Sequence, residues 1–220
     1  MGVIIINFKA YKEGFGERAL EIAKAAEEIM NKTDEYIAIA PNIVDLAEII
    51  KKTSVDVFAQ HVDPVDYGSY TGSITAEMIK EKGARGSLIN HSEKRLKLWE
   101  IEYLVSKFRK LGLISVVCTN NVNTTAAASA LNPDYVAVEP PELIGTGIPV
   151  SKAEPDVVRS SVKVAKDVNK NVKVLCGAGI TTHEDYVTAI ELGAEGVLIA
   201  SGIVKAKDPK KALKELVGLM

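Results

Sequence analysis

Short apolar runs recur along the chain and are separated by segments with a longer period. Eight of these runs are rich in β-branched residues and are candidate strands: VIIINF (3–8), YIAIA (36–40), VDVFA (55–59), GSLIN (86–90), LISVVC (113–118), YVAVE (135–139), NVKVLC (171–176) and GVLIA (196–200). Several are apolar at almost every position, which is typical of strands in a parallel sheet that is covered on both faces. Helices must therefore pack on them.

The segments between these runs have helical patterns. Residues 18–30 place apolar side chains on one stripe, and residues 45–52 and 160–170 repeat the pattern. Strands that alternate with helices predict right-handed crossovers and a parallel sheet, either open and doubly wound or closed. Eight units favour a closed eight-stranded parallel (β/α)8 barrel, the TIM-barrel architecture, with helices shorter than usual.

Composition narrows the class of protein. A length of 220 residues with 47% hydrophobic composition predicts one barrel domain spanning residues 1–220. The net charge of -2 comes from interspersed acids and bases, so we expect no nucleic-acid partner. Two cysteines are too few for a disulfide framework, and neither a targeting segment nor a membrane span is recognisable, so we expect a cytoplasmic protein that does not bind membranes.

Candidate chemistry lies directly after the strands, because active sites of such barrels gather at the carboxyl ends of the strands. The polar residues at these positions are Asn7 and Lys9, Gln60 and His61, Asn90, His91 and Glu93, Asn120 and Asn121, and Glu139. The seventh and eighth strands end in CGAGI and IASGI, whose small residues let backbone N–H groups approach an anion. The combination indicates proton transfer on a small phosphorylated substrate.

Each of these residues also has a simpler interpretation when taken alone. Lys9 is compatible with a solvated rim lysine, and His91 with a surface residue or one that serves a helix start. Glu139 is either an ordinary loop carboxylate or a base that its apolar strand desolvates. The glycine-rich turns are unspecific singly, but their occurrence after strands seven and eight matches the usual phosphate site of such barrels.

The segment EPPELIGTG, residues 139–147, predicts a movable lid. Two prolines stiffen its beginning, whereas Gly-Thr-Gly at its end can absorb large dihedral changes. A base that removes a proton from carbon needs a dry site through which substrate still passes, and a hinged flap meets both needs. The alternative is an ordinary proline-containing turn before a helix that starts near Ser151.

Five motifs in this order resemble the triosephosphate isomerase family, and specifically its short archaeal branch. They are NFK (7–9), HSEKR (91–95), EPPELIGTG (139–147), CGAGI (176–180) and ASG (200–202), and the resemblance runs through the whole chain. It implies an aldose–ketose isomerase that interconverts dihydroxyacetone phosphate and D-glyceraldehyde 3-phosphate in glycolysis and gluconeogenesis. It implies neither a cofactor nor a metal.

The resemblance also implies the roles of individual residues. Glu139 would be the base, His91 the electrophile and proton shuttle, and Lys9 the group that stabilises developing negative charge. Asn7 would bind substrate beside Lys9, and Glu93 would hold that arrangement in place. Backbone groups of five residues would bind the phosphate: Ile144, Gly145, Gly179, Ala200 and Ser201. Gly179 replaces a serine that is frequent in the family, so a side-chain contact to phosphate is lost there.

Residues 59–75 form a connection that is long and rich in turn residues, which usually marks a functional or interaction loop. The resemblance implies that this loop reaches into a neighbouring subunit, in a homo-oligomer built from dimers and assembled as a tetramer. We expect structural or surface roles for His61 and His183, apolar packing for Cys118 and Cys176, and helix packing for Trp99.

Three other functions compete with the isomerase. A different phosphate-binding barrel would share the glycine-rich turns but need another acid–base pair. A Schiff-base aldolase would need a lysine in the barrel mouth, whereas Lys173 lies near the start of its strand. A catalytically idle barrel could bind phosphorylated metabolites without turnover, and a coupled isomerase assay separates that case from an enzyme.

Overall fold

The computed structural model describes residues 2–140, 149 and 153–219. The strands form a closed barrel in sequence order, and every neighbouring pair is parallel. They are β1 (Val3–Asn7), β2 (Tyr36–Ala40), β3 (Asp56–Ala59), β4 (Gly86–Ile89), β5 (Ile114–Thr119), β6 (Tyr135–Val138), β7 (Lys173–Gly177) and β8 (Gly196–Ile199). Closure comes from β8, which pairs with β1. The predicted barrel and its strands are confirmed.

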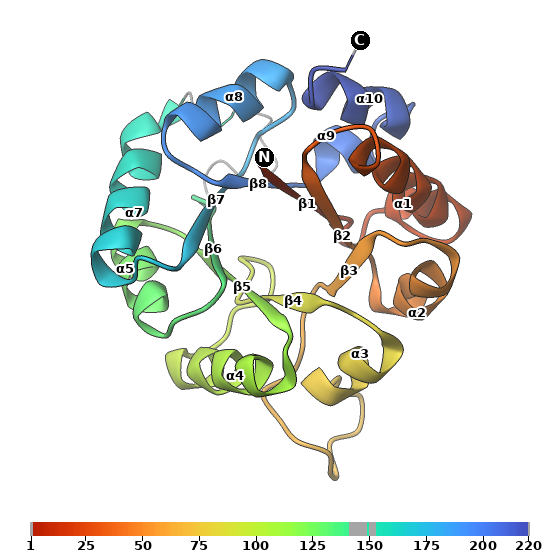
Figure 1. Cartoon of the computed structure of the whole chain (residues 1–220). Helices are drawn as coiled ribbons and strands as arrows, with labels where there is room; N and C mark the ends of the chain where they lie inside the picture. The colour runs from red at the N-terminus through yellow and green to blue at the C-terminus, as the bar shows by residue number, and fades with distance from the viewer. Residues whose placement is uncertain (1, 141–148, 150–152, 220) are drawn as a thin grey trace.

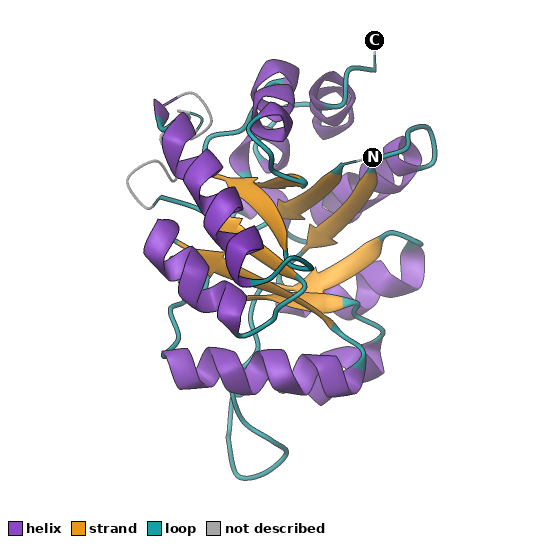
Figure 2. Ribbon diagram, turned by 60° about the vertical axis from the view of Figure 1, so that its left-hand side comes forward, coloured by secondary structure: helices purple, strands orange, loops and turns teal. Residues whose placement is uncertain are grey.

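Helices surround the barrel as an outer ring (Figures 1 and 2). Those described are η1 (Lys12–Gly14), a 3-10 turn, α1 (Glu17–Met30), α2 (Ile43–Lys52), α3 (Ala76–Lys82), α4 (Leu98–Leu111), α5 (Val122–Ala130), α7 (Pro155–Val168), α8 (His183–Glu191), α9 (Ser201–Val204) and α10 (Pro209–Leu216). None of the described helices has the length and apolarity that a bilayer crossing requires.

Local sequence signals explain several helix ends. Asn42 and Thr75 each accept a backbone N–H in the first turn of α2 and α3. Pro155 and Pro209 occupy the first position of α7 and α10, where the missing N–H costs no hydrogen bond. The glycine after α4, Gly112, takes the left-handed conformation that ends a helix.

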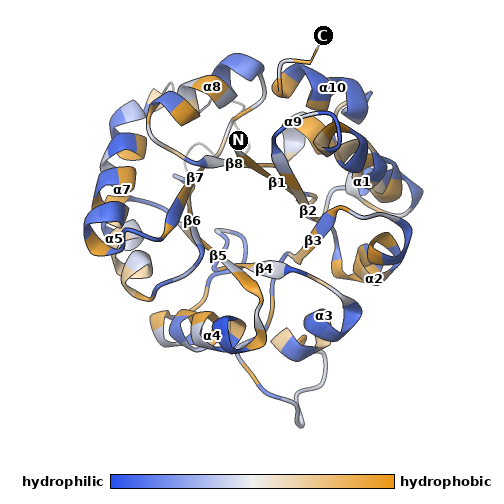
Figure 3. Cartoon of the chain, viewed as in Figure 1, coloured by the Kyte–Doolittle hydropathy of each residue, from blue (hydrophilic) through white to orange (hydrophobic). Residues whose placement is uncertain are grey.

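Alternation along the strands divides the apolar side chains into two layers. One buried cluster contains only strand residues from all eight strands, including Ile5, Ala137 and Leu198, and therefore fills the barrel interior. The other joins the remaining strand positions, such as Ile4 and Ile6, to the inner faces of the helices. Figure 3 shows the result: helices are hydrophilic outside and hydrophobic toward the strands.

The same alternation positions two predicted site residues. Val3 and Ile5 point into the barrel, so Asn7 continues their row at the carboxyl end of β1. Tyr135 and Ala137 point inward from β6, so Glu139 follows them in the same row. The carboxylate therefore reaches the barrel mouth because of strand periodicity.

The connection between β3 and α3 projects away from the barrel (Figures 1 and 2). Lys107 on α4 holds its base, because the ammonium donates to the Val65 carbonyl at 3.2 Å and pairs with Asp66 and with Glu77. Farther along, Tyr67 and Tyr70 are exposed. The loop thus has a fixed base and an accessible tip that carries two aromatic side chains.

One packing expectation is wrong. Trp99 lies on α4, but its side chain is 58% exposed. The buried stripe of this helix runs through Ile101, Leu104 and Phe108, and residue 99 falls outside that stripe. Trp99 therefore adds to the apolar surface of the chain.

Candidate active site

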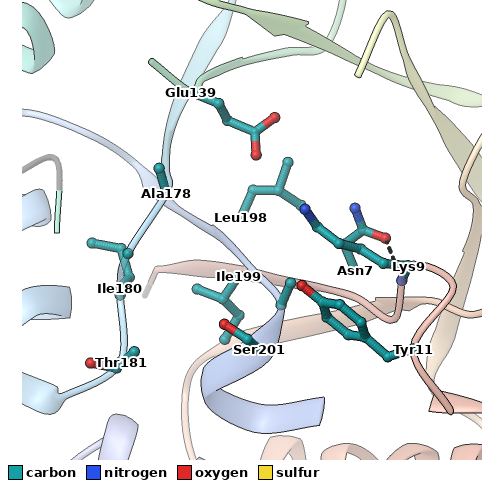
Figure 4. Close-up of a pocket in the computed structure, with 12 residues that line it drawn as sticks. Asn7, Lys9, Tyr11, Glu139, Ala178, Ile180, Thr181, Leu198, Ile199 and Ser201 are labelled. Carbon is teal, nitrogen blue, oxygen red and sulfur yellow. Dashed lines mark hydrogen bonds between the residues drawn. The ribbon is translucent and has the colours of Figure 1, made fainter. Parts of the chain in front are cut away.

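A pocket opens at the carboxyl ends of the strands and joins the loops after β1, β6, β7 and β8 (Figure 4). Its volume is about 460 Å³, a figure that includes open solvent at its mouth. The lining residues are Asn7, Lys9, Tyr11, Glu139, Ala178, Gly179, Ile180, Thr181, Leu198, Ile199, Ala200 and Ser201.

Lys9 is held in a left-handed backbone conformation with φ of 51°. Asn7 accepts the Lys9 N–H at 3.0 Å through its side-chain oxygen. Gln60, from the loop after β3, donates to the Lys9 carbonyl at 3.0 Å and to the Ala40 carbonyl at 2.9 Å. These hydrogen bonds fix the backbone at Lys9 from several sides. The residue therefore keeps a left-handed conformation that is strained for any residue other than glycine.

The Lys9 ammonium forms an ion pair with Glu93. Nζ lies 2.9 Å from Oε1, and the lysine side chain is 9% exposed whereas the glutamate is 57% exposed. A buried cation needs a fixed counter-charge, and Glu93 supplies it from the solvent side. Lys9 therefore presents one oriented positive charge at the pocket, which excludes its interpretation as a solvated rim lysine.

His91 is buried, and its hydrogen bond identifies the neutral tautomer. The backbone N–H of Glu93 donates to Nδ1 at 3.1 Å. Since an amide can only donate, Nδ1 carries no proton, and the ring proton lies on Nε2. The alternative that His91 serves a helix start is wrong, because the next helix, α4, begins at Leu98 after a separate turn.

Glu139 lines the pocket, and His91 lies next to it without belonging to the pocket lining. Nε2 of His91 lies 3.6 Å from Oε2 of Glu139, beyond hydrogen-bond range, and both side chains are almost fully buried. Both atoms are buried without a hydrogen-bond partner among the described residues. Buried polar atoms are normally satisfied, so this pair indicates groups that serve a bound molecule.

The walls around Glu139 are apolar and contain both cysteines, which are buried as expected. Burial raises the pKa of the Cys118 thiol well above its ordinary value, and the adjacent Glu139 charge adds to the shift. Burial likewise raises the pKa of Cys176 to about 12, again with a contribution from Glu139. Both thiols therefore stay protonated and contribute as small hydrophobic groups.

The structure brings three of the predicted phosphate-binding residues together. Gly179, Ala200 and Ser201 all line the pocket, and Figure 4 shows Ser201 on the side away from Glu139. Ile144 and Gly145, the lid segment 139–147 beyond Pro140, and Ser151 lie outside the described residues. Of the glycine-rich turn after β7, Ala178 and Gly179 both have positive φ, 71° and 74°.

The start of α8 does not offer its first amides to a ligand. The carboxylate of Asp185 accepts the N–H groups of Thr181 and Thr182 at 3.2 and 3.0 Å, and Thr182 caps the Asp185 N–H in return. The amides left for an anion on this side are therefore those nearer Gly179, before the helix.

The pocket is not lined by the other polar residues predicted after the strands, which are Gln60, His61, Asn90, His91, Glu93, Asn120 and Asn121. His61 contacts Asp63 at 3.3 Å, and Nδ1 of His183 lies 2.8 Å from the Leu216 carbonyl oxygen. Lys173 is the first residue of β7 and stacks over Tyr135, at the opposite end of the strands from Glu139. Within the described part of the chain, His, Cys, Asp and Glu side chains form no group of three that could hold a metal ion.

Sequence reasoning missed Tyr11 and Thr181, which both line the pocket. Tyr11 lies two positions beyond Lys9 in the same loop, and an aromatic residue beside an expected phosphate site was the signal available. Thr181 follows the predicted glycine-rich turn directly and could have been included with it.

Comparisons with known proteins show the family of the chain. The triosephosphate isomerase family model matches residues 2–218. The chain is 71% identical to the triosephosphate isomerase of Archaeoglobus fulgidus over 220 residues, which covers 100% of this chain and 99% of the relative. It is 55% identical to that of Methanocaldococcus jannaschii over 215 residues, 98% of each chain.

Proposed function

The chain belongs to the triosephosphate isomerase family and isomerises a triose phosphate, a step of glycolysis, and we propose that Glu139, His91, Lys9 and Asn7 perform the chemistry. The substrates are dihydroxyacetone phosphate and D-glyceraldehyde 3-phosphate, interconverted through an enediolate.

Glu139 is the proposed base. Its carboxylate takes a proton from the carbon beside the substrate carbonyl, the C–H electron pair forms the carbon–carbon double bond, and the carbonyl π pair moves onto oxygen. Returning the proton to the adjacent carbon gives the isomer. Almost complete burial of Glu139 supports this role, because a dry site strengthens electrostatic interactions and excludes side reactions.

His91 and Lys9 stabilise the oxygen that becomes negative. The bond at Nδ1 leaves the Nε2–H of His91 beside the Glu139 carboxylate, and from there it donates to the carbonyl oxygen and shuttles protons between the two enediolate oxygens. The Lys9 ammonium adds a positive charge, which Glu93 orients and Asn7 supports through the Lys9 backbone. The proton transfers are thus divided between one carboxylate, which acts at carbon, and one imidazole, which acts at oxygen.

One observation carries the assignment: Nε2 of His91 and Oε2 of Glu139 are 3.6 Å apart, buried, and without partners among the described residues. Two groups that did not serve a ligand would be expected to satisfy each other or another residue. Gly179, Ala200 and Ser201 complete the proposal as phosphate-binding residues, together with Ile144 and Gly145 beyond the described part.

A dehydrogenase-coupled isomerase assay tests this proposal. We expect the wild-type chain to convert glyceraldehyde 3-phosphate, and Glu139→Ala to lower turnover by about 10²- to 10⁴-fold. Affinity for a phosphate-bearing analogue should stay within a few-fold. Unchanged turnover in this variant would remove the base assignment, and a wild-type chain without isomerase activity would favour an idle binding barrel.

We also propose a homo-oligomer of dimer units, assembled as a tetramer, in the cytoplasm. Support comes from the projecting loop between β3 and α3, with Tyr67 and Tyr70 exposed, and from the family resemblance. Light scattering coupled to size exclusion distinguishes monomer, dimer and tetramer. The Schiff-base alternative is not favoured, because Lys173 lies at the other end of the barrel.

A further inference from the structure

Tyr11 faces the pocket that the proposed reaction uses. It lies in the loop between β1 and η1, two residues beyond Lys9, and lines the pocket together with Gly179, Ala200 and Ser201. In Figure 4 the Tyr11 ring lies on the same side of the pocket as Ser201, apart from Glu139, and its phenol oxygen is directed into the pocket. Tyr11 is therefore at the end of the pocket proposed for the phosphate.

The Tyr11 hydroxyl is an available donor. Its backbone is fixed, because its carbonyl accepts the Gly14 N–H at 3.0 Å, and its ring is half-buried against the core. The hydroxyl itself makes no hydrogen bond to a described residue. A buried or half-buried tyrosine usually finds a partner for its O–H, so a ligand in the pocket is a suitable one.

A second cation accompanies the ring. The ammonium of Lys205, at the end of α9, lies 4.1 Å from the centroid of the Tyr11 ring. This separation is well inside the roughly 6 Å limit of a cation–π contact. The contact joins the loop after β1 to the segment after β8, so it restrains the ring from two parts of the chain that close the barrel.

Charge is distributed unevenly along the pocket as a result. Glu139 and Lys9 both line the pocket, whereas Lys205, which is exposed and does not line it, brings a further positive charge next to Tyr11. A dianionic phosphate placed near Tyr11 would gain from this charge and avoid the carboxylate. Backbone amides alone would supply no such long-range attraction.

We propose that Tyr11 and Lys205 form a phosphate-recognition pair, in which the phenol donates a hydrogen bond to a phosphate oxygen while the ammonium orients the ring and adds positive charge. This assignment rests on the proposed function, and it names a side-chain contribution where sequence reasoning expected backbone amides only. The pair acts on the non-reacting end of the substrate, whose binding energy positions the reacting carbon.

The experiment compares substrates with and without the phosphate. We expect Tyr11→Phe to lower kcat/KM for glyceraldehyde 3-phosphate by about 10-fold or more, the effect of one hydrogen bond to a charged group. Lys205→Met should lower it by about 3- to 5-fold, a typical cation–π contribution. The kcat/KM for glyceraldehyde, which lacks the phosphate, should change less than about twofold in either variant. Neither substitution alters the contacts that the enzyme makes with the rest of the substrate.

A matched pair at the other end of the barrel provides the control. Lys173 lies over the Tyr135 ring at 5.5 Å, so Tyr135→Phe and Lys173→Met remove the same groups without touching the pocket. Both variants should leave kcat/KM for the two substrates unchanged. Equal losses on both substrates in Tyr11→Phe, or no loss at all, would overturn the proposal.

Binding of inorganic phosphate, measured by calorimetry, keeps this test separate from the isomerase assignment. Tyr11→Phe should weaken it by about the same 10-fold. If the wild-type chain fails to isomerise but Tyr11→Phe still weakens phosphate binding, the proposed reaction is wrong and the phosphate pair stands. If isomerisation proceeds while Tyr11→Phe binds phosphate normally, the pair is wrong and the reaction stands.

Discussion

Gly177 lies against the side chain of Glu139, and no larger residue fits there. A Cβ at Gly177 would come within 2.3 Å of Glu139 Cγ and 3.1 Å of its Oε1. Real Cβ contacts do not approach so closely, so the carboxylate would have to move. The β7 glycine therefore defines where the proposed base sits.

Gly177→Ala should consequently impair the reaction by displacing the Glu139 carboxylate, without removing any reacting group. Displacement of a reacting group by about 1 Å can cost on the order of 10²-fold in rate, and we expect a fall of that size in kcat. Steady-state kinetics measures it. Gly112→Ala is the control: a Cβ there meets nothing within 4 Å, so the left-handed backbone costs stability, about 1 kcal/mol, without affecting turnover. Equal kinetic effects in the two variants would exclude this role for Gly177.

Glu93→Gln should weaken the reaction through Lys9. The substitution removes the counter-charge at 2.9 Å but keeps the backbone N–H that bonds Nδ1 of His91. We expect kcat to fall by about 10-fold, the value of one charge-assisted hydrogen bond, with a smaller change in KM. Glu100→Gln, which changes a glutamate in the first turn of α4, should be neutral for kinetics. A normal kcat in Glu93→Gln would show that Lys9 needs no such support.

Because its two thiols are buried, we expect the protein to become less stable at alkaline pH. Folded pKa values of Cys118 and Cys176 are raised above the ordinary value of 9.0, so the unfolded chain loses these protons first. The contribution of these thiols to the free energy of unfolding is complete below about pH 9. It declines as the pH rises toward about 12, the pKa of Cys176 in the folded protein. Each thiol can contribute a slope of up to about 1.4 kcal/mol per pH unit.

Denaturant unfolding at pH 7.5, 9 and 10 measures this decline. The double variant Cys118→Ala, Cys176→Ala should have a lower free energy of unfolding at every pH. Its free energy of unfolding should also fall less steeply with pH, because it has no thiols to ionise. Tyrosines add to the slope only at higher pH: burial raises the pKa of Tyr36 and of Tyr186 from 10.0, and hydrogen bonds to Asp56 and Glu35 add to the shifts. A slope between pH 9 and 10 that is identical in both proteins would contradict the prediction.

Lys107→Met should release the projecting loop. Burial alone would lower the pKa of Lys107, but hydrogen bonds to Asp66, Glu77 and Tyr103 outweigh burial and raise it. Removing the ammonium leaves Glu77, whose Oε2 is already buried without a partner among the described residues, without its counter-charge. We expect a loss of about 1–3 kcal/mol in the free energy of unfolding.

Hydrogen exchange of residues 63–74 should accelerate in this variant, because the backbone of the loop loses its anchor. Lys52→Met is the comparison: Lys52 pairs with Glu48 on the surface of α2, where solvent screens both charges, so its removal should leave the free energy of unfolding almost unchanged. If the two lysine variants are equally stable, the contacts of Lys107 with Val65, Asp66 and Glu77 do not fix the loop.

Periodicity in the sequence was sufficient to predict the barrel, since each run such as residues 135–139 encodes a strand and the side of the barrel on which its residues lie. It also places Glu139 at the mouth, because a strand that alternates correctly carries its last side chain inward. Contacts that join distant segments were not predictable. Gln60 reaches the Lys9 carbonyl, and Lys205 reaches Tyr11, across 51 and 194 positions of the chain.

Two other features depended on three-dimensional detail. The exposure of Trp99 follows from the rotation of α4, which the helix pattern near its first turn did not specify. The tautomer of His91 depends on one amide in a turn whose shape no pattern predicts. Sequence therefore indicated candidate residues and left open how their polar atoms are paired.

The pocket lies over the junction of β1 and β8, where the first and last strands of the barrel meet. Occupancy by a ligand that contacts both sides would fasten the two ends of the chain to each other. Unfolding that starts by detaching the first or last strand would then have to release the ligand beforehand, so metabolite supply would protect the fold against proteases in proportion to its concentration.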